Sequence, residues 1–364
     1  MRVRAKAKGI GVSLAGSIDS MKSPVPSSPN FGAIVLAAYQ PDSVLFERQL
    51  KSIQDQTHRD FICLISADGG YEEIRDRVAQ IVENDERFVV LGFDQRLGFY
   101  QNFERGLADV PASARWVALS DQDDYWYKDK LELMLPHLDR EILVAAQARV
   151  VDDRGNVIQE VTDRRDSPFL QLFVQNQVTG GIALFRRSLL DVALPFPRLH
   201  TMTQVHDHWL AVCAQCMGGV KILDTVVQDY VQHGGNVIGE AVKGFNPVKS
   251  IKRARELANR YEGGERWADI ARLIQKMTYG WRRVMAETLI ERFGVGNDGA
   301  RRAITVFGAQ HRWYPVLRVL ASGVRRGNVS VPFLLTFIAG VPIEVYEQRS
   351  LASVNPVDLK TKGF

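Results

Sequence analysis

The stretch AIVLAAYQPD, residues 33–42, joins six consecutive apolar residues to a polar turn that contains a proline. An apolar run without polar alternation is typical of a strand that is buried on both faces. A helical pattern follows over residues 43–55, and a second apolar run, residues 61–66, ends shortly before Asp68-Gly69-Gly70. The stretch therefore predicts the first strand of a parallel sheet, with a helical crossover to the second strand.

Strands and helices continue to alternate along the chain. Helical patterns cover residues 71–84 and 100–108, and strands are predicted at 88–92 and 116–119. Such alternation indicates βαβ units, so the expected fold is α/β and Rossmann-like, with a mainly parallel central sheet flanked by helices. Ligands of these sheets bind beyond the carboxyl ends of the strands. Polar clusters at Tyr39, Asp68 and Asp121 fall at that position.

Three parts of the chain are predicted. Residues 1–30 contain a Ser/Pro cluster and are expected to form a disordered basic arm. Residues 31–240 carry the α/β pattern, which also includes a strand at 143–151, a hairpin turn at 152–156, a helix at 208–217 and a strand at 220–223. Residues 241–364 form a basic helical C-terminal region, with a boundary expected near 241–248.

The net charge of +4 is distributed unevenly. Residues 1–240 contain 25 Lys and Arg against 32 Asp and Glu, whereas residues 241–364 contain 21 against 10. A basic second part favours an anionic partner, such as phospholipid or a polyanionic acceptor, although a solvated helical face explains it equally well. No apolar run reaches the roughly 18 to 20 residues of a membrane span, so any membrane contact is expected to be peripheral.

The three cysteines are too few to staple a domain of this size, which indicates a reducing compartment and a cytoplasmic location. Cys213 and Cys216 lie in an apolar helical pattern, and no second cysteine pair completes a zinc site. They are expected to pack in the core. Trp126 and Trp209 could stack on the ring of a ligand, although buried tryptophans are the commoner case.

Three acids follow the predicted strand at 116–119, in the segment Asp121-Gln122-Asp123-Asp124. In an extended segment alternate side chains share a face, so Asp121 and Asp123 could converge on one cation. Mg²⁺ and Mn²⁺ prefer oxygen ligands, and Mg²⁺ is commonly held by one or two carboxylates together with substrate phosphates. The segment therefore predicts a clamp for a metal and a diphosphate, with an acidic surface turn as the alternative.

A set of short motifs in a fixed order carries a family resemblance. The motifs are AAYQP at 37–41, QDQT at 54–57, SADGG at 66–70, LGFYQNF at 97–103, DQDDYW at 121–126, VTGG at 178–181, HDHW at 206–209 and QHGGN at 232–236. In this order they resemble family 2 glycosyltransferases of the GT-A fold. Within that family they look most like the bacterial rhamnosyltransferase-type enzymes of surface polysaccharide synthesis.

The resemblance implies an inverting, metal-dependent transferase that uses Mg²⁺ or Mn²⁺. The enzyme would move a sugar, rhamnose or another hexose, from a nucleotide-diphosphate donor to a glycan or lipid-linked acceptor. A lipid-linked acceptor would place it at the inner face of the membrane. No nucleic-acid partner is expected, because no recognised module is present.

The resemblance also assigns residue roles. Tyr39 and Asp68 would contact the nucleotide base, and Asp121 the ribose and metal region. Asp123 would bind the divalent ion, and His233 the metal or diphosphate. Asp207 would be the general base. The family often has an arginine where this chain has Val231, and Arg96 could replace the missing positive charge.

Each role has a simpler structural alternative. Asp207 precedes an apolar helix, so it could be an N-cap, and as a base at a helix N-terminus its pKa would be lowered by the helix field. His233 could be a polar surface group in a turn. Gly180 and Gly181 could let a sugar approach the backbone or could form a strand-edge turn.

Two rival functions use the same residues. A nucleotidyltransferase would need the same acid pair, but such enzymes usually have a glycine-rich basic loop after the first strand, and residues 39–42 are not one. A catalytically silent membrane-associated scaffold would use only the basic C-terminal region.

Overall fold

The computed structural model describes residue 28 and residues 30–353, except 94, 200, 202, 234–246 and 310–312. The predicted arm at 1–30 therefore lies almost wholly outside the described residues. Most of the predicted boundary at 241–248 does as well.

The first half of the fold is a run of βαβ units. It consists of β1 (Gly32–Ala38), α1 (Ser43–Gln54), β2 (Phe61–Ala67), α2 (Tyr71–Ile81), β3 (Phe88–Gly92), α3 (Phe99–Ala108) and β4 (Trp116–Ser120). These strands are parallel in the order β3-β2-β1-β4. Every residue of β2 is buried, as the unbroken apolar run predicts. The elements predicted over residues 33–119 are thus confirmed, with end points that shift by three residues or fewer.

The second half of the sheet is mixed. It contains β5 (Tyr125–Trp126), β6 (Leu143–Asp152), β7 (Val157–Gln159), β8 (Ala183–Arg186) and β9 (Val220–Gln232). β8 is antiparallel to both β4 and β6, whereas β6 and β9 are parallel. The predicted hairpin turn at 152–156 is confirmed, because β7 pairs with β6 in antiparallel fashion. β9 runs nine residues beyond the predicted strand at 220–223.

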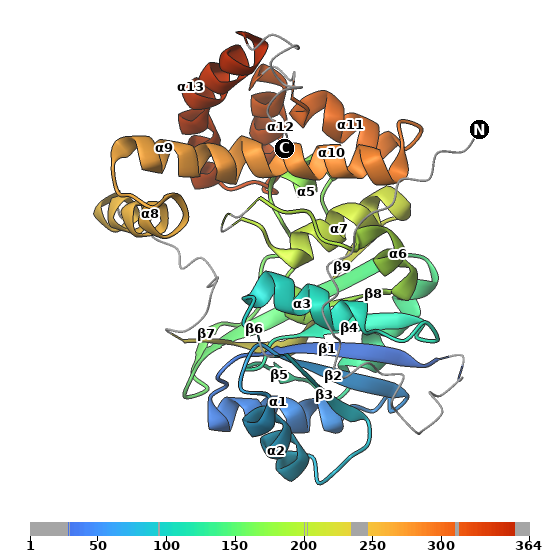
Figure 1. The fold of residues 1–364 in the computed structure, drawn as a ribbon. Helices are drawn as coiled ribbons and strands as arrows, with labels where there is room; N and C mark the ends of the chain where they lie inside the picture. The colour runs from blue at the N-terminus through green and yellow to red at the C-terminus, as the bar shows by residue number, and fades with distance from the viewer. Residues whose placement is uncertain are drawn as a thin grey trace, which may run out of the picture.

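Helices cover both faces of the sheet. α1 and α2 lie on one face, and α3 lies on the other with α7 (His206–Met217) (Figure 1). α1 begins at a side-chain cap, because Asp42 Oδ1 accepts hydrogen bonds from the backbone N–H groups of Val44 and Leu45 at 3.0 and 3.1 Å. Its inward residues, Phe46, Leu50 and Ile53, are fully buried. Short helices α4 (Lys130–Met134), α5 (Phe169–Val174) and α6 (Leu190–Ala193) complete this part.

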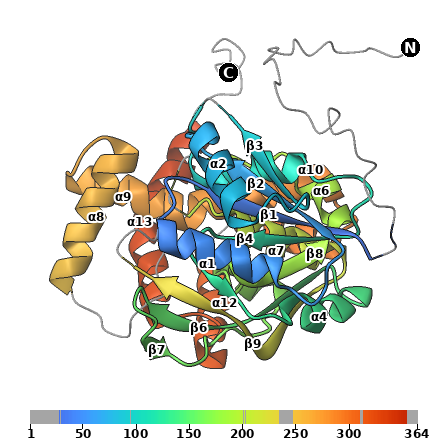
Figure 2. The same cartoon turned by 90° about the horizontal axis from the view of Figure 1, so that it is seen from below.

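The C-terminal region is helical, as predicted. It comprises α8 (Pro247–Glu262), α9 (Trp267–Gln275), α10 (Trp281–Phe293), α11 (Asp298–Phe307), α12 (Trp313–Arg326) and α13 (Val331–Ser353). α8 and α9 lie together at one side of the molecule in both views (Figures 1 and 2). Within the described residues, no helix is both long and apolar enough to cross a membrane.

One apolar core joins the C-terminal helices to the α/β part. Trp281, Met285 and Leu289 of α10 are buried in the same cluster as Leu172 of α5 and Trp209 of α7. α10 to α13 therefore form a third layer above α3 and α7, on the side away from α1 and α2 (Figure 1).

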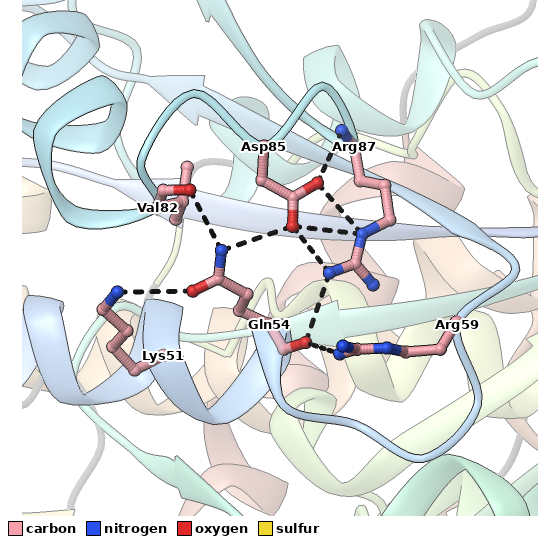
Figure 3. A network of polar contacts seen from close by, with 6 residues as sticks. All are labelled: Lys51, Gln54, Arg59, Val82, Asp85 and Arg87. Atoms are coloured by element: carbon pink, nitrogen blue, oxygen red, sulfur yellow. Dashed lines mark hydrogen bonds and ion pairs between the residues drawn. The ribbon is translucent and has the colours of Figure 1, made fainter.

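A polar network ties the end of α1 to the turn between α2 and β3 (Figure 3). The Arg87 guanidinium pairs with Asp85 at 2.6 Å and donates to the Gln54 carbonyl oxygen at 3.2 Å. The Gln54 side-chain amide donates to the Val82 carbonyl oxygen at 3.0 Å. The network lies where α1 ends and β3 begins, which is the amino edge of the sheet, so it serves the fold.

Candidate active site

The carboxyl edge of the parallel strands gathers the predicted nucleotide-contacting residues. Tyr39 follows β1, and its backbone is clamped by the Gln122 side chain, which accepts from the Tyr39 N–H at 2.7 Å and donates to its carbonyl oxygen at 3.1 Å. The Arg96 guanidinium carbon lies 3.8 Å from the centre of the Tyr39 ring. Tyr39 and Arg96 thus form one stacked pair at this edge.

Asp68 follows β2 and is only 2% exposed. Its carboxylate accepts hydrogen bonds from the backbone N–H groups of Leu97 and Gly98 at 2.7 and 2.8 Å and pairs with Arg105 at 3.3 Å. Gly98 has a φ of +82°, a conformation that favours glycine. Asp68 therefore holds the turn that begins α3 and carries Arg96, a structural role that sequence reasoning did not foresee.

The acidic segment after β4 sends its side chains in different directions. Asp123 lies 2.8 Å from His233 Nε2. Asp124 is fully buried and accepts hydrogen bonds from Gln228 Nε2 at 2.9 Å and from the Val231 N–H at 3.2 Å. Burial raises the pKa of Asp121, and the nearby charges of Asp123 and Asp207 raise it further.

Gly180 and Gly181 form the tight turn before β8, and the acids meet around it. The Gly180 N–H donates to Asp207 Oδ2 at 3.2 Å. A Cβ atom placed on Gly181 would lie 3.0 Å from Asp124 Oδ2 and 3.5 Å from Asp121 Oδ2. The two carboxylates therefore occupy the space that a side chain at position 181 would need.

His206 is packed against the same turn. Its ring stacks on Phe103 with a centroid distance of 3.9 Å, and a Cβ atom on Gly180 would lie 2.7 Å from its Nε2. The expected turn next to a strand is therefore present, and the close packing of His206 and Asp124 explains why both of its positions are glycines.

Lys130, at the start of α4, is fully buried next to this turn. Its Nζ donates to the Gly181 carbonyl oxygen and to Gln228 Oε1 and lies 3.6 Å from the centre of the Trp126 ring. Burial lowers its pKa, and Asp124 and Asp121 oppose that shift. Sequence reasoning missed Lys130, because a lysine that begins an ordinary helix carries no signal of burial.

Asp207 is the second residue of α7, and its carboxylate is held from three sides. Oδ1 accepts from the His208 N–H at 2.6 Å and from Asn176 Nδ2 at 2.9 Å, and Oδ2 accepts from Gly180. The N-cap position belongs to Val205, so the capping alternative for Asp207 is wrong.

The expected lowering of the Asp207 pKa by the helix is also wrong. Burial raises its pKa to about 6, because the loss of water outweighs the hydrogen bonds from His208, Gly180 and Asn176 that favour the ionised form. The carboxylate is thus ionised at neutral pH but titrates close to it.

The remaining candidates pack in the core. Trp126 and Trp209 are 1% and 0% exposed, so their faces are not available to a sugar. Cys213 is buried and Cys216 half-buried, and both are free thiols, as expected for core residues. Among the described residues, no group of three or more His, Cys, Asp or Glu side chains is arranged to hold a metal ion by itself.

Residues 34–193 match the family model described as Glycosyl transferase family 2. An uncharacterized glycosyltransferase of Methanocaldococcus jannaschii is 21% identical over 188 residues, which are 50% of this chain and 64% of that protein. TuaG of Bacillus subtilis is a putative teichuronic acid biosynthesis glycosyltransferase. It is 35% identical over 89 residues, which are 24% of this chain and 34% of TuaG.

A solved structure is also similar. The mannosyltransferase PcManGT from Pyrobaculum calidifontis, in complex with GDP-Man and Mn²⁺, gives a TM-score of 0.45 at 17% identity. The match covers 90% of this chain and 91% of that chain.

Proposed function

We propose that the chain, whose residues 34–193 match the model described as Glycosyl transferase family 2, transfers a sugar from a nucleotide-diphosphate donor to a hydroxyl of a glycan or lipid-linked acceptor. The sugar would be rhamnose or another hexose, and the product would serve cell-surface polysaccharide synthesis. The observation that carries the proposal is the meeting of Asp121, Asp207 and the Asp123–His233 pair near the Gly180–Gly181 turn.

The donor nucleotide would bind at the carboxyl edge of β1 and β2. The stacked Tyr39 and Arg96 offer a flat, positively charged surface for the base and its phosphates. Asp68 would contact the base, since each carboxylate oxygen can accept more than the one backbone hydrogen bond it has here. Asp121 would lie next to the ribose.

A divalent ion would be held by Asp123 and His233, with Asp121 close by. The fit is partial, because two side chains do not form a complete protein cage. It is nevertheless the donor set expected when diphosphate and water supply the other ligands, and three neighbouring carboxylates favour a cation. When bound, Mg²⁺ or Mn²⁺ would offset the charge of the leaving diphosphate.

Asp207 would be the general base. The hydrogen bonds from Asn176, Gly180 and His208 hold its carboxylate in one orientation and leave lone pairs for a substrate hydroxyl. The acceptor proton would move to Asp207 while the acceptor oxygen bonds to the anomeric carbon. The bond from that carbon to the diphosphate oxygen would break on the opposite face, which inverts the configuration.

Two measurements test the proposal. In a thermal-shift screen, dTDP-, UDP- and GDP-sugars are compared with and without Mn²⁺, since a ligand of the folded state raises the apparent stability. A donor that stabilises the protein is then used in transfer assays. No shift with any of these donors, in either condition, would count against a nucleotide-sugar enzyme.

The base assignment is tested with Asp207→Asn. This variant should bind the donor normally and transfer sugar about 10²- to 10⁴-fold more slowly. Asp129→Asn changes an exposed acid in the turn before α4, so it is the matched control and should behave as the wild type. Normal turnover of Asp207→Asn would show that another group removes the proton.

A further inference from the structure

Between residues 331 and 346, the solvent face of α13 is apolar. Val331, Leu335, Ile338 and Tyr346 are 53%, 55%, 45% and 72% exposed. The other exposed residues between positions 331 and 346 are Pro332, Ala339 and Pro342. All seven fall on one side of the helix at 100° per residue. Exposed apolar faces of this length are rare on soluble proteins unless something covers them.

The inner face of α13 fixes this orientation. Phe337 is fully buried and packs against Tyr279 with a ring-centroid distance of 5.3 Å. Glu344 is 1% exposed, pairs with Arg283 and accepts a hydrogen bond from Gln275 at 2.7 Å. If α13 rotated to bury its apolar side, Phe337 and Glu344 would lose these contacts. The apolar side therefore stays exposed to solvent.

The neighbouring helix α12 adds aromatic and basic side chains. Tyr314, Arg318, Ala321 and Arg325 are exposed and lie on one face of α12, with exposed Trp313 at its start. α12 and α13 lie side by side in the layer farthest from α1 and α2 (Figure 1).

The charge of this part of the chain is one-sided. Between Asp298 and Glu347 the sequence contains six arginines and one acid, Glu344. Glu344 is buried and ion-paired, and Arg301 and Arg302 pair with Asp298. Arg318, Arg325 and Arg326 are exposed and form no ion pair within the described residues.

We propose that the outer faces of α12 and α13 dock on an anionic lipid bilayer. An apolar helix face that lies parallel to the membrane, beside tryptophan, tyrosine and arginine, has the composition of an interfacial helix. A second copy of this chain fits less well, because it would bring the same arginines together. The inference rests on the proposed function in one respect: docking on the bilayer would bring the active site to a lipid-linked acceptor.

The test uses flotation of the full chain with two kinds of vesicle, phosphatidylcholine alone and phosphatidylcholine mixed with phosphatidylglycerol. The wild type should float with the mixed vesicles and stay behind with the neutral ones. Leu335→Asp/Ile338→Asp should lower bound protein at least tenfold. Arg318→Gln/Arg325→Gln should lower it about tenfold and weaken its dependence on salt.

The matched control is Val44→Asp/Val295→Asp, which adds the same charge at apolar residues that are 72% and 73% exposed elsewhere. It should float as the wild type does. Flotation of Leu335→Asp/Ile338→Asp at the wild-type level would overturn the proposal. Light scattering without vesicles gives a second check. A dimeric wild type and a monomeric Leu335→Asp/Ile338→Asp variant would also overturn the proposal, because a second copy of the chain would then cover the apolar face. If the wild type floated normally but bound no nucleotide-sugar donor, the proposed transferase function would be wrong and the docking surface would still stand.

Discussion

At the scale of single residues, the site depends on carboxylates that play different roles in spite of being close together. Asp124 and Asp68 are buried and accept hydrogen bonds from neighbouring amides, whereas Asp123 pairs with His233. Asp207 also accepts hydrogen bonds from amides, but it keeps lone pairs for the proposed acceptor. Direction and burial separate these roles, so substitutions of neighbouring acids should have unlike effects.

Asp123→Ala should abolish the dependence of donor binding on Mn²⁺, because it removes the proposed carboxylate ligand. Titration calorimetry with the donor that the thermal-shift screen identifies measures this with and without the ion. Asp129→Ala, an exposed acid six residues along the chain, should bind as the wild type does. Equal Mn²⁺ dependence in wild type and Asp123→Ala would exclude Asp123 as a ligand.

The activity should fall on the acid side of neutrality. Burial raises the pKa of Asp207 to about 6, above its ordinary value, so the carboxylate takes up a proton as pH falls through that value. A protonated Asp207 cannot accept the proton of the acceptor, so kcat/KM should decline tenfold per pH unit well below the pKa. Rate profiles measure this, and a flat profile through pH 6 would contradict the assignment.

At the scale of secondary-structure elements, local pattern predicted the first half of the sheet well. β1, β2 and β4 are continuous apolar runs because helices cover both of their faces. β9 was predicted too short, because two polar and exposed residues, Asp224 and Thr225, interrupt its apolar run directly after Leu223. β5 and β8 have two and four residues and gain their strand character from pairing with β9, β4 and β6.

The candidate site shows the same limit. Positions at strand ends, such as Asp68 and Asp121, could be predicted because parallel strands place their carboxyl ends together. Lys130, Asn176 and Gln122 could not, because each acts through a partner at least 31 positions away. The Asp207 pKa was misjudged for a similar reason: the sequence revealed the helix but not its burial.

The network at the amino edge should stabilise the fold without affecting the chemistry. Asp85→Ala leaves a partly buried Arg87 and the Gln54 amide without their carboxylate, which should cost about 1–3 kcal/mol of unfolding free energy. Urea denaturation measures the loss, and the rate of transfer should be unchanged. Asp163→Ala breaks an exposed pair with Arg165 and should cost less than about 1 kcal/mol. Equal losses would mean that the network is no stronger than a surface pair.

At the scale of the whole molecule, the α/β part and helices α10 to α13 depend on one another. Phe307 of α11 packs on Phe173 of α5 at a centroid distance of 5.0 Å, and the Arg282 guanidinium donates to the Val174 carbonyl oxygen. The buried Arg282 and the rings beside it would lose their partners if either part opened.

This shared core predicts one cooperative unfolding transition for the chain. Two domains with separate cores would unfold in two steps, but separating these parts would expose Trp209, Trp281 and Phe307, which are all fully buried. Differential scanning calorimetry should give a single peak whose calorimetric and van't Hoff enthalpies agree. A stable fragment ending at residue 233 would contradict this, because it would have to fold with the apolar side of α5 and α7 exposed to water.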